Sequence, residues 1–148
     1  MSTTSLGKKQ IPIAEGIFSW PSDDPRLIAS KCDNCGEVIF PTQEICPNCS
    51  QGMKKKILLS KRGTLDNYSA QFARPPHWSD PAKKPYVATE DFAPYGVGTV
   101  RMPEGLYIIS VLTESDPAKL KVGMDVELVV EKLYEEGNEV MGFKFKPV

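Results

Sequence analysis

The chain has 148 residues, of which 41% are hydrophobic, and its formal net charge at pH 7 is −1. This length fits one ordinary domain, or a small module joined to one compact domain. A chain so close to neutrality has no bulk attraction for phosphate backbones, which usually draw a basic face. The composition therefore argues against a nucleic-acid binder that works through net charge.

An N-terminal arm, placed at residues 1–25, has the pattern of irregular chain with scattered apolar anchors. Pro12 and Pro21 discourage a continuous helix there. The arm has no apolar core of signal-peptide length, and no stretch of the chain approaches the roughly 18 apolar residues of a membrane span. We therefore expect a cytoplasmic protein without a membrane partner, in a compartment that keeps thiols reduced.

Two CxxC pairs hold every cysteine of the chain, Cys32 with Cys35 and Cys46 with Cys49. Two such knuckles converge four thiolates on one tetrahedral ion, for which zinc is the ordinary occupant. Disulfides or a thioredoxin-like redox pair are the competing uses, but there is no secretory signal and both pairs flank strand-like runs. We therefore predict a structural Zn²⁺ on these four residues. A closed four-sulfur site leaves no coordination position open for catalysis.

Short strand-like runs at residues 26–31 and 37–40 flank the first pair. With the second pair they predict a zinc ribbon over residues 26–52, whose hairpin turn is itself the metal clip. Gly36 allows the bend after the first pair, and Pro47 fixes a φ angle inside the second. The lysine-rich run at 53–56 is typical of a solvated linker.

Strand signals dominate residues 53–148, with runs at 63–72, 95–102, 106–113 and 124–134 and a final run that contains Phe143 and Phe145. Asp116 and Pro117 favour one helical turn before the fourth run. Five short strands with one helical turn predict a small Greek-key barrel of the OB type, with an antiparallel sandwich as the alternative. The expected fold class is mostly β, an N-terminal zinc ribbon followed by this OB-type barrel.

A proline-rich loop at residues 73–94 separates the first two barrel runs. Its prolines exclude a ladder strand, and its mixture of aromatic and basic side chains favours an ordered contact loop over disorder. These side chains are His77, Trp78, Tyr86, Arg74, Lys83 and Lys84.

The sequence contains no recognisable catalytic constellation. There is a single histidine, every cysteine is assigned to metal, and neither a GxSxG elbow nor a Walker loop is present. Gly96 and Gly98 indicate a bulge or a close backbone approach rather than a phosphate cradle. A single-stranded nucleic-acid-binding OB module is an alternative function, although Phe143 and Phe145 fall on the apolar phase of their strand and not on a stacking platform.

Several motifs together resemble one known family: Trp20-Pro21, Pro25-Arg26-Leu27-Ile28, the two knuckles, Tyr95-Gly96-Val97-Gly98 and Leu120-Lys121-Val122-Gly123-Met124. Over residues 14–145 the chain resembles the OB-fold proteins with a rubredoxin-like zinc ribbon, a family of accessory subunits. Only the four cysteines carry over as functional positions. The resemblance implies no catalytic residue in this chain.

The resemblance implies instead that the chemistry belongs to a partner. Family members accompany thiolases or thiolase-like enzymes of acyl-CoA metabolism, and others partner MaoC-like enoyl-CoA hydratases, which are the alternative here. The Tyr-Gly-Val-Gly version resembles the small subunit of a degradative thiolase such as benzoylsuccinyl-CoA thiolase. We therefore expect a hetero-oligomer in which the arm 8–21 and the loop 74–93 contact the catalytic subunit through Trp20, His77, Trp78 and Tyr86. Arg74, Lys83 and Lys84 are expected to meet the phosphates of a coenzyme A thioester at a shared site.

Overall fold

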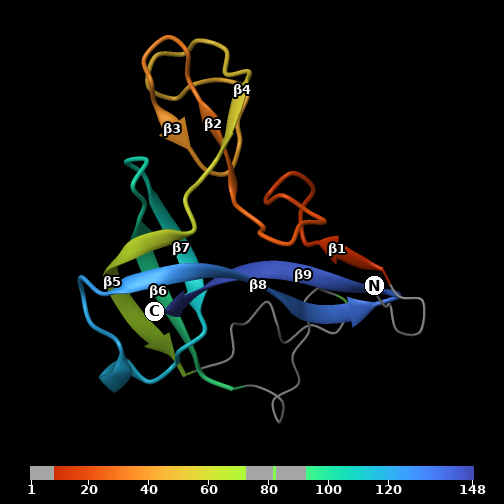
Figure 1. The fold of residues 1–148 in the computed structure, drawn as a ribbon, viewed down its shortest axis with the longest axis vertical. Coiled ribbons are helices and arrows are strands. Elements are labelled where there is room, and N and C mark those ends of the chain that lie inside the picture. The colour runs from red at the N-terminus through yellow and green to blue at the C-terminus, as the bar shows by residue number, and fades with distance from the viewer. Residues whose placement is uncertain (1–8, 73–81, 83–92) are drawn as a thin grey trace.

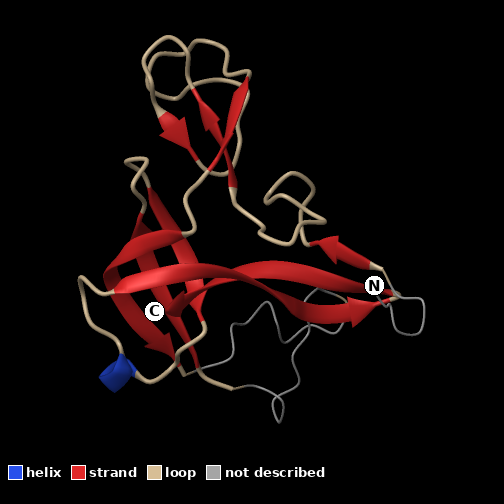
Figure 2. Cartoon of the chain, in the orientation of Figure 1, coloured by secondary structure: helices blue, strands red, loops and turns tan. Residues whose placement is uncertain are grey.

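The computed structural model describes residues 9–72, 82 and 93–148, and nearly all of its regular structure is strand (Figures 1 and 2). A three-stranded sheet in the order β3-β2-β4 stands at one end of a six-stranded sheet in the order β1-β9-β7-β6-β5-β8. In chain order the elements are β1 (Gln10–Pro12), β2 (Ile28–Lys31), β3 (Val38–Ile39), β4 (Lys55–Leu58), β5 (Arg62–Gln71), β6 (Tyr95–Arg101), β7 (Tyr107–Leu112), the 3₁₀ turn η4 (Pro117–Lys119), β8 (Asp125–Glu136) and β9 (Asn138–Pro147).

Five strands of the larger sheet close into a barrel. β5 pairs with β6 and β8, β7 pairs with β6, and β9 pairs with both β7 and β8. Alternation along these strands turns Leu65, Val100, Val126 and Phe145 inward, and each of these residues is fully buried. The predicted fold class, a zinc ribbon followed by an OB-type barrel, is confirmed.

Two local predictions inside the barrel also hold. A Cβ atom on Gly98 would lie 2.7 Å from Leu65 Cδ1, so this glycine permits the close approach of β5 and β6. At the start of η4 the Asp116 Oδ1 accepts a hydrogen bond from the Ala118 amide at 2.9 Å. No helix among the described residues is long and apolar enough to cross a membrane.

The ribbon and the barrel share one hydrophobic core. Phe18, Leu27 and Leu59, which lie at the base of the ribbon, belong to the same buried cluster as Phe145 and the other barrel residues. The rings of Phe40 and Phe143 meet edge to face, with centroids 5.7 Å apart. The ribbon is therefore attached to the barrel by apolar packing as well as by the chain.

The lysine-rich run at 53–56 is not simply a linker, and this part of the interpretation was wrong. Residues Lys55–Leu58 form β4, which pairs antiparallel with β2 of the ribbon. The sequence does not indicate this strand, because its lysine side chains are exposed and only Ile57 turns toward the core. The predicted ribbon range, 26–52, does not include this strand.

The arm also contains a strand that its sequence does not reveal. β1 runs parallel to β9 in the register Ile11 with Val140, and the Ile13 amide donates to the Met141 carbonyl at 2.7 Å. Three residues ending in proline carry no measurable periodicity, and the partner strand lies at the other end of the sequence. The arm thus lies across its own barrel.

Candidate metal centre

The two cysteine knuckles have the same backbone hydrogen bonds. In the first, the Cys32 carbonyl accepts from the Gly36 amide at 2.9 Å, and the Cys32 amide donates to the Glu37 carbonyl at 2.8 Å. In the second, Cys46 makes the equivalent pair of bonds with Ser50 and Gln51, each 2.8 Å long. Each turn needs a positive φ at its fifth residue, which Gly36 adopts at +80° and Ser50 at +65°.

This matched geometry brings the four thiols together. Their Sγ atoms all lie within 4.8 Å of one another, although Cys35 is exposed and Cys46 is buried. The shortest distances join one knuckle to the other, 3.5 Å between Cys32 and Cys49 and 3.6 Å between Cys35 and Cys46. Four ligands at about 2.3 Å from a tetrahedral zinc ion lie roughly 3.8 Å apart, so the described residues fit one such ion. All four cysteines are free thiols, which is not the arrangement that the disulfide alternative requires.

Two asparagine side chains bridge the knuckles. The Asn48 amide donates to Cys35 Sγ at 3.4 Å, and this bond is the main cause that lowers the pKa of the Cys35 thiol. A side-chain hydrogen bond from Asn34 is the largest cause lowering the pKa of Cys49, to about 6. Both donors favour the thiolate form that a metal requires.

Burial acts in the opposite direction on the second knuckle, where it raises the pKa of Cys46 to about 11. A metal ion that binds here must therefore displace a proton from that thiol. All four positions would be occupied by sulfur, so a bound zinc would hold the two turns together and would not activate water.

The asparagines were not identified from the sequence, although a signal was present. Asn34 and Asn48 each precede the second cysteine of their pair, so both knuckles read Cys-x-Asn-Cys. A repeated polar residue at one position of a metal knuckle indicates a second set of contacts to the ligands.

Of the residues predicted to contact a partner or coenzyme A, only Trp20 lies in the described part of the chain. Trp20 is half-buried, packs edge-on against Phe18 with centroids 5.9 Å apart, and donates from Nε1 to the Gln10 carbonyl at 3.0 Å. Its contact with a partner stays a prediction. Six residues lie outside the described part of the chain: Arg74, His77, Trp78, Lys83, Lys84 and Tyr86.

Known proteins with the same two-part organisation are similar to this chain. The sequence profile described as "ChsH2, rubredoxin-like zinc ribbon domain" matches residues 20–53, and that described as "ChsH2, C-terminal OB-fold domain" matches residues 57–131. A DUF35 domain-containing scaffold protein of Methanothermobacter thermautotrophicus is 35% identical over 141 residues, covering 91% of this chain and 98% of that relative.

A further relative is the benzoylsuccinyl-CoA thiolase subunit BbsA of Thauera aromatica, 27% identical over 136 residues, which cover 89% of this chain and 85% of the relative. Among solved structures, the Ltp2-ChsH2(DUF35) aldolase matches with a TM-score of 0.57 and 24% identity, over 82% of this chain and 84% of that one. This last match shows a shared fold. The chain belongs to the DUF35 (ChsH2) family, in which a rubredoxin-like zinc ribbon precedes an OB-fold domain.

Proposed function

We propose that this chain is a non-catalytic, zinc-binding scaffold subunit that docks on a thiolase-like catalytic subunit of acyl-CoA metabolism. The observation that carries the proposal is the position of the thiols. A thiolase needs a cysteine nucleophile and a second, acid–base cysteine. All four cysteines of this chain stand together in the candidate metal centre, which leaves none for that chemistry.

The names of several relatives support an enzyme partner. One is a thiolase subunit and three are described as scaffold proteins, a role that needs a fixed shape and no reactive group of its own. A metal-clipped ribbon that shares a core with a barrel has such a shape. The cytoplasm, where thiols stay reduced, is the compartment we propose.

We also propose that the loop 74–93 reaches the acyl-CoA site of the partner, where Arg74, Lys83 and Lys84 meet coenzyme A phosphates. Reversing these three charges should raise the Michaelis constant of the complex for acyl-CoA without changing the affinity between the subunits. An unchanged Michaelis constant would rule out this role.

The decisive experiment is co-purification. The chain is tagged in its native cells, and the proteins that come with it are identified by mass spectrometry and assayed for thiolysis of an acyl-CoA. A thiolase-sized partner whose activity depends on this chain is the expected result. A MaoC-like hydratase would replace the thiolase in the proposal, and a lone chain that binds single-stranded DNA at low salt would refute it.

A further inference from the structure

The outer face of β7 exposes more apolar surface than a strand in a closed barrel needs. Ile109 is 76% exposed and Tyr107 is 57% exposed, and Ile109 is the most exposed large apolar residue among those described. The alternate residues Ile108, Ser110 and Leu112 are buried in the barrel. The side chains of Tyr107 and Ile109 therefore do not contribute to the core. Such exposure of large apolar side chains is typical of a contact surface.

The outer edge of β7 is also largely unpaired within the described residues. β7 pairs with β6 along its whole length, but with β9 only where Leu112 faces Phe145. The hydrogen bond from the Met102 amide to the Leu106 carbonyl sets the phase of the β6–β7 ladder. Alternation in an antiparallel ladder then aims the backbone groups of Tyr107 and Ile109 at the other edge. An edge of this kind, without charge or proline on it, is ready to pair with another strand.

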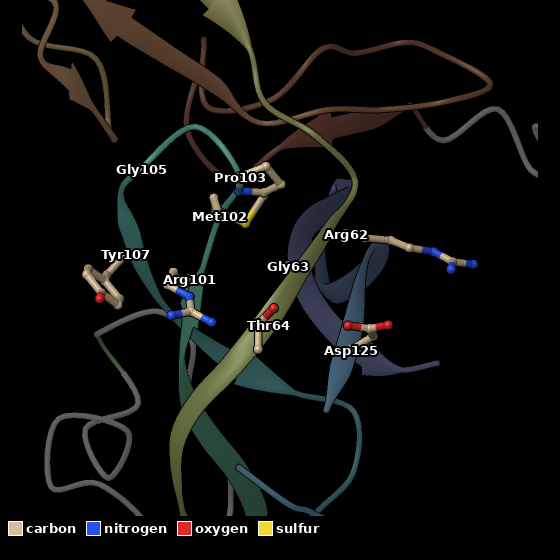
Figure 3. A pocket seen from close by; sticks show the side chains of 9 residues that line it. All are labelled: Arg62, Gly63, Thr64, Arg101, Met102, Pro103, Gly105, Tyr107 and Asp125. Atoms are coloured by element: carbon tan, nitrogen blue, oxygen red, sulfur yellow. The ribbon is translucent and has the colours of Figure 1, made fainter. Parts of the chain in front are cut away.

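A cation lies on the same outer face, on the neighbouring strand β6 and therefore one strand in from this edge. Arg101 faces Tyr107 across the β6–β7 register and lines a hollow of about 640 Å³ together with Thr64 and Asp125. Figure 3 shows the Arg101 guanidinium between Tyr107 and Thr64, whereas Arg62 points away. Arg62 pairs with Glu127 at 3.7 Å, but no salt bridge to Arg101 is found within the described part of the chain. A carboxylate from outside would complete this group.

We propose that the β7 surface, defined as Arg101, Tyr107 and Ile109, binds an extended segment of the catalytic subunit. The segment adds to β7 as a strand, covers Tyr107 and Ile109 with its apolar side chains, and reaches across Tyr107 with an acidic side chain to Arg101. Unpaired backbone groups select a strand over a helix, and the guanidinium selects an acidic segment. This inference rests on the proposed scaffold function and names the surface that performs it.

The test uses charge-introducing variants with matched controls. Ile109→Asp and Arg101→Glu are titrated calorimetrically against the thiolase-like subunit that co-purifies with the wild-type chain. Each should weaken binding by about tenfold or more. Val122→Asp, at a residue that is 67% exposed in the loop before β8, and Lys119→Glu in η4 should bind as the wild type does. Unchanged zinc content and melting temperature verify that all four variants fold.

Amide hydrogen exchange separates strand pairing from simple contact. The backbone amide of Ile109 should exchange rapidly in the free chain and become protected in the complex, while amides of β6 keep their protection. Weaker binding by the variants without protection at Ile109 would overturn the strand arrangement.

The remaining outcomes distinguish this inference from the proposed function. If the wild type binds the thiolase and both surface variants bind equally well, the β7 surface is wrong and the scaffold function stands. If Ile109→Asp abolishes a concentration-dependent dimer of this chain instead, a second copy is the occupant and the inference is overturned. If no acyl-CoA enzyme binds the wild type, the function fails and the inference fails with it.

Discussion

The cysteine knuckles of the ribbon and the barrel are stabilised by different means. Around the cysteines, the buried cluster of the ribbon consists of Cys32, Cys46 and Met53, with Ile39 and Cys49 packed against it. Three of these five residues are themselves candidate metal ligands. Without a metal ion, the part of the ribbon that contains the two knuckles therefore has almost no core. The barrel instead buries a large set of aliphatic and aromatic side chains that need no ion. The two cysteine knuckles should therefore depend on the metal ion, whereas the barrel and the ribbon strands packed against it should depend on apolar volume.

The largest expected effect comes from breaking the metal centre. Cys46→Ser should abolish stoichiometric zinc binding, because serine supplies no thiolate ligand. The chain then loses an apparent binding free energy that is about 10–16 kcal/mol for structural sites in small zinc modules. Metal content is measured by atomic emission, and the fold by amide NMR spectra. Amides of the two knuckles should lose their dispersion while barrel amides retain theirs. Knuckles that stay folded without metal would contradict this prediction.

The reciprocal change removes apolar volume from the barrel. Phe145→Ala, at a fully buried residue of β9, should lower the free energy of unfolding by about 3–5 kcal/mol. Urea denaturation followed by circular dichroism measures the loss. Zinc binding by the folded variant should be unchanged, so a variant that folds but loses its metal would contradict the separation.

A third variant tests the connection between the two parts. Glu104 Oε2 accepts hydrogen bonds from both the amide and the hydroxyl of Ser60, each at 2.8 Å, where the chain leaves the ribbon for the barrel. Glu104→Ala should cost about 1–3 kcal/mol, because it leaves these donors without their acceptor. Glu104→Gln, which keeps an acceptor oxygen, should recover part of the loss in thermal denaturation. Glu15→Ala, at an exposed carboxylate, is the control.

A smaller effect, of opposite sign, is expected in the second knuckle. Ser50 adopts the positive φ that Gly36 adopts in the first, and a residue with a Cβ is strained there. Ser50→Gly should stabilise the metal-bound chain by about 0.5 kcal/mol, after the greater freedom of glycine in the unfolded state is counted. Gly36→Ser should destabilise it. Equal melting temperatures for both would show that the turn is not strained.

The smallest effect concerns pH. The Asp24 carboxylate pairs with Lys61 Nζ at 2.7 Å and with Arg26 Nη2 at 3.0 Å. Both cations lower the pKa of this carboxyl, and the hydrogen bond from Lys61 is the largest cause. A lowered pKa contributes stability above the unfolded-state value of 3.8, and this stability is lost as the pH falls through the folded-state pKa. Asp24→Asn should therefore be slightly less stable than the wild type at pH 7 and equal to it in strong acid. A difference that persists in acid would assign the effect to something other than charge.

Much of this organisation could be predicted because it depends on local spacing. Two CxxC pairs specify a four-sulfur site, and alternation specifies the barrel strands, since Val126, Leu128 and Phe145 lie on the apolar phase of their strands and are all buried. β1 and β4 could not be predicted, because each is too short to show a period and gains its stability from a distant partner strand. The contacts of Asn34 and Asn48 depend on how the two knuckles face each other, which spacing alone does not give.

The position of β9 has a consequence for synthesis on the ribosome. This strand pairs with β1, β7 and β8, and residues 138–147 leave the exit tunnel after all of these partners. The barrel therefore cannot close cotranslationally until the last of its strands is free, whereas both knuckles have emerged long before. We expect the nascent ribbon to bind its metal ion first. Phe40 is then already in place when Phe143 leaves the tunnel and packs against it.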